Sequence, residues 1–177
     1  MASITYILQF RGKGTPGSDP TKLKIKSAAD SLNVSTTITY AGVASTLEVC
    51  PGDNASFESD VTFLGTTSFQ ESGTIRFPGG HVLNFSTVGQ GIIGASANSG
   101  TQSGSVIWKI ESGEGQFANA SGFIASNFTV DTEGNVIDNH LAVIFHKGRI
   151  AVRHTEHKTE RGWFFKKGKC CNFAGVL

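Results

Sequence analysis

Residues 124–145 read IASNFTVDTEGNVIDNHLAVIF, and this stretch decides the fold class. Apolar residues recur with a period of two on both sides of residues 131–135, which are polar and contain Gly134. Such alternation is typical of a β-strand with one buried face, and a short glycine-containing loop joins two strands into a hairpin. The stretch therefore predicts two neighbouring antiparallel strands.

The same period recurs along the rest of the chain, which gives at least seven expected strands. The further strands are expected at 4–10, 56–63, 68–77, 81–88 and 105–110. No segment shows a convincing helical period, although residues 26–32 are compatible with one short helical turn. Many short strands separated by turn residues favour an all-β fold, an antiparallel barrel or sandwich.

Composition supports one domain and shows an uneven distribution of charge. The chain has 177 residues, of which 16% are charged and 22 are glycine, and this excludes coiled coils and long helical bundles. Residues 1–145 contain seven basic and twelve acidic residues, whereas residues 146–177 contain eight basic and two acidic ones. We therefore expect a β-barrel domain at 1–146 and a basic C-terminal strand or arm at 147–177, packed on the barrel or extending from it.

Two motifs partly match known cofactor or metal sites, but neither has the spacing or context that such a site needs. Residues 89–94 match the glycine pattern of dinucleotide-binding proteins, but a flexible loop and not a helix is expected after them. His154, His157, Cys170 and Cys171 match no standard zinc-binding spacing. The sequence predicts no cofactor and no metal. The basic residues around Trp163–Phe165 form one short patch, so nucleic-acid binding is not favoured.

The location of the protein is predicted from what its sequence lacks. No charged leader with an apolar run opens the chain, and no apolar stretch reaches the length of a membrane span. The three cysteines are odd in number and two are adjacent, which fits reduced thiols better than a disulfide framework. We expect a cytoplasmic protein without a membrane span.

A few polar residues interrupt the apolar faces of the expected strands. Glu71 is in phase with Phe69, Ser126 with Phe128, and Asn139 with Ile137 and Leu141. In a closed barrel these residues would face an apolar lumen, where burial raises the pKa of a carboxyl group and makes it a candidate acid or base. The alternative is a bulge at Gly73 that turns Glu71 to solvent.

Two stretches resemble the allene oxide cyclase and dirigent superfamily of eight-stranded barrels. Residues 113–122, GEGQFANASG, are similar to the G-x-G-x-F-x-x-A-x-G turn of these families. Residues 6–16, YILQFRGKGTP, are similar to the N-terminal run of the allene oxide cyclases. The resemblance implies an antiparallel eight-stranded, calycin-like barrel and a homo-oligomer, a trimer or a dimer.

The resemblance also implies site residues, and one of them departs from the family. The family's catalytic glutamate falls at Ile7, its asparagine at Gln9, and its Ser-Pro pair at Thr15 and Pro16. Alternation instead predicts that Tyr6 and Phe10 face inward. Glu71, on another strand, could take the place of the missing carboxylate.

Two functional hypotheses follow. In the first, the barrel is a cofactor-independent cyclase or isomerase that folds an apolar oxylipin-, polyketide- or terpenoid-like molecule into a reactive conformation. In the second, it is a non-catalytic barrel that binds a hydrophobic ligand or guides a reaction as dirigent proteins do. The candidate catalytic residues are Glu71, Gln9, Thr15 and Pro16, and the candidate ligand-binding residues are Tyr6, Ile7, Ser126, Asn139, Phe69 and Phe128.

Overall fold

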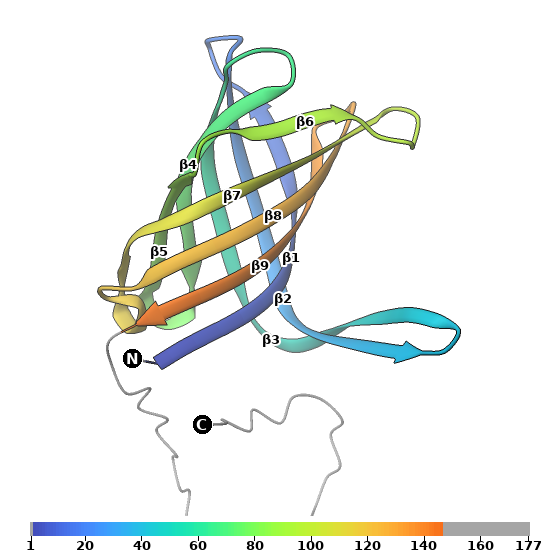
Figure 1. Ribbon diagram of the computed structural model, residues 1–177. Helices are drawn as coiled ribbons and strands as arrows, with labels where there is room; N and C mark the ends of the chain where they lie inside the picture. The colour runs from blue at the N-terminus through green and yellow to red at the C-terminus, as the bar shows by residue number, and fades with distance from the viewer. Residues whose placement is uncertain (1, 147–177) are drawn as a thin grey trace, which may run out of the picture.

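The computed structural model describes residues 2–146, which form a closed antiparallel barrel (Figure 1). Eight strands close the ring in the order β1, β2, β3, β4, β5, β7, β8, β9 and back to β1, while the short β6 pairs with β4 and β7 at one end. The elements are β1 Ala2–Pro16, β2 Lys22–Thr39, β3 Gly42–Phe63, β4 Ser68–Phe77, β5 His81–Thr87, β6 Gly91–Ala95, β7 Thr101–Glu114, β8 Ser121–Asp131 and β9 Asn135–His146, with the 3-10 turns η1 Pro78–Gly80 and η2 Gly115–Phe117.

The predicted eight-stranded barrel is confirmed, and residues 26–32, which are compatible with one short helical turn, form none. This segment lies within β2, where Ile25 and Ala29 turn inward and Lys24 and Lys26 turn outward. The two lysines pair with Asp60 and Glu58 across β3. Spaced lysines with small or aliphatic residues between them have a period of two, which is the period of a strand.

Aromatic side chains fill the middle of the barrel. Phe57 packs against Phe10 at 5.7 Å, Phe85 at 5.4 Å and Trp108 at 5.6 Å between ring centroids. All four rings are almost completely buried. Such packing excludes solvent from this part of the lumen, so any free interior volume must lie nearer an end.

The corner at residues 113–122 closes one end of the barrel, as its resemblance to the superfamily turn implies. Phe117 of η2 is buried beside Ala120 and lies 5.4 Å from the ring of Phe77. Gly122 has a φ of +143°, and a Cβ atom there would lie 2.1 Å from the carbonyl oxygen of Val143. Only glycine fits this position, because any side chain would meet the backbone of β9.

Several expectations lie outside the described residues. These are the basic C-terminal strand or arm at 147–177, the zinc candidates and the aromatic patch at 163–165. Within residues 89–94 the strand β6 begins at Gly91, and the next element after it is β7, so no helix follows these glycines, as the sequence predicts. Within residues 2–146, no helix is long and apolar enough to cross a membrane.

Candidate functional site

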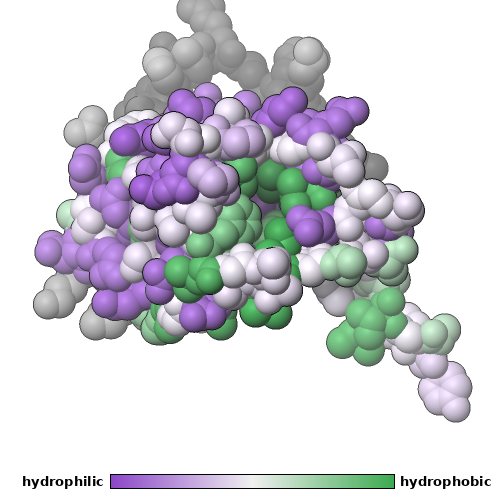
Figure 2. Space-filling model, turned by 90° about the horizontal axis from the view of Figure 1, so that it is seen from above, coloured by the Kyte–Doolittle hydropathy of each residue, from purple (hydrophilic) through white to green (hydrophobic). Residues whose placement is uncertain are grey.

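The end of the barrel that β6 covers contains a cavity of about 140 Å³. Seen from above in Figure 2, this end is hollowed, and apolar side chains surround the hollow. Three of the twelve lining residues are polar, namely Glu71, Gln102 and Asp138. The apolar lining consists of Leu23, Ile25, Val61, Phe63, Phe69, Ile93, Phe128, Val130 and Val136.

Glu71 faces this cavity from β4. Pairing between β3 and β4 runs without a shift from Ser56 to Phe63, so the alternative of a bulge at Gly73 is wrong. The Glu71 side chain is buried, and its Oε1 accepts a hydrogen bond of 2.5 Å from the Ser59 hydroxyl. The hydroxyl of Thr87 accepts from the Glu71 N–H and donates to its carbonyl oxygen. Both neighbours fix the position of the carboxyl group.

Burial raises the pKa of Glu71 from 4.5 to about 8. Loss of hydration is the largest cause, because it disfavours the charged form. The hydrogen bond from Ser59 opposes the rise, and the negative charge of Asp138 adds to it. At neutral pH, Glu71 is therefore mostly a neutral carboxylic acid that can donate a proton.

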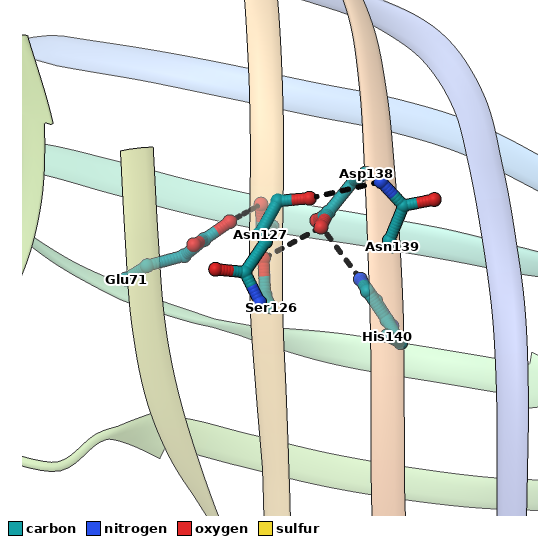
Figure 3. A network of polar contacts seen from close by, with 7 residues as sticks. Glu71, Ser126, Asn127, Asp138, Asn139 and His140 are labelled. Atoms are coloured by element: carbon teal, nitrogen blue, oxygen red, sulfur yellow. Dashed lines mark hydrogen bonds and ion pairs between the residues drawn. The ribbon is translucent and has the colours of Figure 1, made fainter. Parts of the chain in front are cut away.

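Asp138, on β9, contacts two polar side chains on the same wall of the barrel. Its Oδ1 accepts from the Ser126 hydroxyl at 2.6 Å, and its Oδ2 lies 2.9 Å from Nε2 of His140. Figure 3 shows Glu71 reaching from β4 towards the strands that carry these three residues. Both oxygens of Asp138 are therefore engaged by side chains of β8 and β9, whereas the carboxyl group of Glu71 is held by Ser59 of β3.

The polar network ends in an aromatic enclosure around His140. The imidazole lies 4.5 Å from the ring of Phe10, 5.4 Å from Phe57 and 5.0 Å from Trp108. Among the described residues, its Nδ1 has no hydrogen-bond partner. The rings fix the imidazole, and the imidazole in turn fixes Asp138.

Tyr6 also faces the interior, as its alternation with Ile7 predicts, but it does not line the cavity. Its ring packs edge-on against Phe77 at 5.8 Å. Burial, and to a lesser extent the charge of Asp138, raises the pKa of its phenol above the ordinary value of 10.0. The hydroxyl is buried and has no partner within residues 2–146. Tyr6 is therefore neutral, behind the cavity rather than in its wall.

The expectation that Asn139 faces the lumen is wrong, and Ile7 also lies on the outer face. Ile7 is 40% exposed, and Asn139 is exposed beside it on β9. The error arises because β9 is apolar on both faces. Its outer face carries Leu141 and Val143, while its inner face is interrupted by Asp138 and His140, so the more apolar face is the outer one.

The residues carried over from the superfamily are not brought together with Glu71. The Gln9 amide donates to Oδ1 of Asn139 at 2.9 Å and accepts from Arg11 at 2.6 Å, on the outside of the barrel. Thr15 and Pro16 are exposed at the end of β1. Phe69, Phe128 and Ser126 do face the interior, and the first two line the cavity.

Sequence reasoning missed Asp138, His140 and Ser59. Asp138 and His140 are in phase with Val136, Ala142 and Ile144 on the inner face of β9. The sequence carries no clear signal for this, because titratable residues at i and i+2 are what the solvent face of a strand normally carries.

A wider groove of about 640 Å³ lies outside the barrel, between β6 and the outer faces of β7 to β9. Asn127, Asn139 and Ser105 are among its lining residues, and no charged residue lines it. We place the candidate site in the interior cavity because only there do buried carboxyl groups meet an apolar wall. Within residues 2–146, no three His, Cys, Asp or Glu side chains are grouped to hold a metal ion.

Comparisons with known proteins show a likeness of fold. No protein-family model matches the chain, and no curated protein sequence matches it. Among solved structures it is similar to the pterocarpan synthase dirigent protein GePTS1, with a TM-score of 0.54 and 13% identity over 83% of this chain and 89% of that one. A second similar structure is the pterocarpan synthase dirigent protein PsPTS1, with a TM-score of 0.49 and 16% identity over 83% of this chain and 97% of that one.

Proposed function

We propose that this barrel binds one small, largely apolar molecule in the cavity beneath β6. The observation that carries the proposal is the lining itself, in which nine apolar side chains surround a pair of buried carboxyl groups. The resemblance in fold to a dirigent protein supports a role of this kind. This is the hydrophobic ligand-binding or dirigent-type hypothesis.

The size of the cavity limits the part of the ligand that it can hold. Apolar protein cavities of about 150 Å³ accept a benzene molecule. A cavity of about 140 Å³ therefore suits one aromatic ring or an aliphatic segment of similar volume. The mouth of the cavity is open, so a longer molecule would extend past β6 into solvent.

The carboxyl groups would select and orient that ring. Protonated Glu71 offers a donor and Asp138 an acceptor, so a ligand with one hydroxyl or carbonyl group would gain directional hydrogen bonds inside an apolar wall. A simple hydrocarbon of the same size would gain only burial of apolar area. We therefore expect phenols to bind more tightly than the corresponding alkylbenzenes.

The test is a titration of 4-fluorophenol followed by ¹⁹F NMR. Val136→Phe would fill the cavity, whereas Ile137→Phe places the same ring on the outer face one residue further along β9. We expect saturable binding to the parent and to Ile137→Phe, and loss of binding in Val136→Phe. Equal binding by both variants would place the ligand elsewhere and refute the proposal.

A second candidate function is acid–base isomerisation or cyclisation without a cofactor. The specific observation in its favour is that Glu71, mostly a neutral acid at pH 7, and the hydrogen-bonded Asp138 line a single apolar cavity. Protonation of an epoxide or carbonyl oxygen by Glu71, with charge compensation by Asp138, would start such a reaction.

This function is tested with an unsaturated fatty-acid epoxide and chiral analysis of its products. The parent should accelerate cyclisation and bias its stereochemistry, and Glu71→Gln should abolish both effects. Gln keeps the size of the side chain but cannot donate a carboxylic proton. Identical products and rates with and without the protein would refute the catalytic function and leave ligand binding as the only proposed function.

A further inference from the structure

The hairpin of β2 and β3 extends well beyond the barrel. Its outer part, residues 31–50, forms a two-stranded ribbon. Beyond Ala28, β2 no longer pairs with β1, and β3 meets β4 only from Ser56 onward. The nine pairs from Ser31↔Cys50 to Thr39↔Gly42 join the ribbon's strands only to each other. Figure 1 shows the ribbon leaving the barrel and extending away from β7, β8 and β9.

The ribbon has one apolar and one polar face. Three of the four cross-strand pairs on the first face are aliphatic, namely Leu32 with Val49, Val34 with Leu47, and Ile38 with Val43, and the fourth is Thr36 with Ser45. The alternate pairs, which include Ser35 with Thr46, lie on the second face. Four of the aliphatic residues are more than half exposed, namely Ile38, Val43, Leu47 and Val49.

Such a ribbon is not stable by its own packing. An isolated two-stranded hairpin is at best marginally stable in water, and an exposed apolar face of this kind marks an interaction surface. Among residues 2–146, nothing covers its apolar face at Val43, which is 72% exposed.

A second apolar surface lies on the outside of the barrel, where four neighbouring strands meet, and is called the outer apolar face. Register places Ile107 opposite Ala125, Ala125 opposite Leu141, and Leu141 opposite Ile7, so these side chains form one row across β7, β8, β9 and β1. Its exposed members are Ile7, Ile107, Phe123, Leu141, Val143 and Phe145.

We propose that the apolar face of the ribbon docks on the outer apolar face of a second copy of this chain. Within one copy the two surfaces cannot meet, because the ribbon points away from the strands that carry the outer apolar face. Each surface supplies the apolar cover that the other lacks. Two copies related by a two-fold axis would bury both ribbons at once.

The area is sufficient for a stable dimer. Nine residues of strand span about 30 Å, and two strands are about 10 Å wide, so one ribbon face covers about 300 Å². Two ribbons on two outer faces bury about 1,200 Å² in total, above the roughly 1,000 Å² that a specific interface needs.

The charge of the ribbon disfavours a membrane as the partner. Residues 31–50 contain one charged residue, Glu48, and no Lys or Arg to pair with anionic lipid. Tyr40, at the tip, is its only aromatic residue. A protein surface with aliphatic and aromatic side chains, such as the outer apolar face, matches it better.

The test measures the oligomeric state of the full chain by sedimentation velocity across a concentration series. Val34→Glu with Leu47→Glu adds two charges to the apolar face, and Ser35→Glu with Thr46→Glu adds the same charges to the polar face one pair further along. We expect a dimer in the parent and in the polar-face variant, and dimerisation weakened by at least about 100-fold in the apolar-face variant. Near-UV circular dichroism checks that the barrel is intact in both.

A charge reversal identifies the docking partner. Leu141→Lys alone, on the outer apolar face, should also dissociate the dimer, and combining it with Leu47→Glu should restore association by pairing opposite charges. Three results would overturn the proposal. The parent could be monomeric, the two double variants could weaken dimerisation equally, or Leu141→Lys could be the only substitution that disrupts the dimer. Binding of a monomeric parent to neutral vesicles through the ribbon would also overturn it, and would identify a lipid membrane as the partner of the ribbon.

Discussion

Replacement of Glu71 by glutamine should change how the stability of the barrel depends on pH. The carboxyl group has a pKa of about 8 in the folded protein, against an ordinary value of 4.5, and burial is the main cause. Folding therefore favours its protonated form. The contribution of Glu71 to stability is fully present below pH 4.5, falls as the pH rises, and is lost above about 8.

The size of the effect follows from the two pKa values. The difference between 4.5 and about 8 corresponds to about 5 kcal/mol over the whole range, and to about 2–3 kcal/mol between pH 5 and pH 7. Glu71→Gln keeps the shape of the side chain and cannot ionise. Its free energy of unfolding, relative to that of the parent, should rise by about 2–3 kcal/mol from pH 5 to pH 7.

Urea unfolding followed by tryptophan fluorescence measures both proteins at each pH, and Trp108 lies in the core near the site. Glu114→Gln is the matched control, because this side chain is exposed and folding does not remove its water. It should leave the pH dependence of the parent unchanged. A constant stability difference between Glu71→Gln and the parent from pH 5 to pH 7 would refute the burial of a neutral carboxyl group.

Four further substitutions test the site and the fold. Ser59→Ala removes the hydrogen bond that lowers the pKa of Glu71. In the same urea series, the pH above which stability stops falling, which marks the pKa of Glu71 in the folded protein, should therefore increase. Asp138→Asn removes a nearby negative charge, so the same pH limit should decrease. An unchanged limit would mean that the two carboxyl groups do not interact. Phe57→Ala should lower the free energy of unfolding by about 3–5 kcal/mol, since the ring fills the centre of the aromatic core. Gly122→Ala should lower it by at least about 1–3 kcal/mol, because alanine is strained at that φ and meets the backbone of β9, and a neutral effect would contradict the tight corner.

The barrel could be predicted from sequence wherever one face of a strand is clearly apolar and the other polar. β4 is such a strand, and its pattern correctly turned Phe69 and Glu71 inward. The start of β2 alternates clearly, with Leu23 and Ile25 between lysines, but residues 27–29 are small and mark no apolar face, so the strand was missed there. The long pairing of β2 with β3 depends on contacts distant in sequence, which no local pattern reveals.

The site was only half predictable for a related physical reason. Ser126 and Glu71 interrupt faces that are otherwise apolar, and this marks them as interior polar residues. Asp138 and His140 lie on a strand with two apolar faces, where a shift of one residue exchanges the inside and the outside. Only closure of the barrel decides which face is internal, and closure depends on the register of all eight ring strands.

The position of a bound ligand gives the sharpest test of the proposed function. Intermolecular nuclear Overhauser effects between 4-fluorophenol and assigned side-chain protons of the full chain would locate it. Contacts to Ile25, Val61 and Phe69, which line the interior cavity, are the predicted result. Contacts confined to Ile92 and Asn127 in the outer groove, or no contacts at all, would contradict a ligand site inside the barrel.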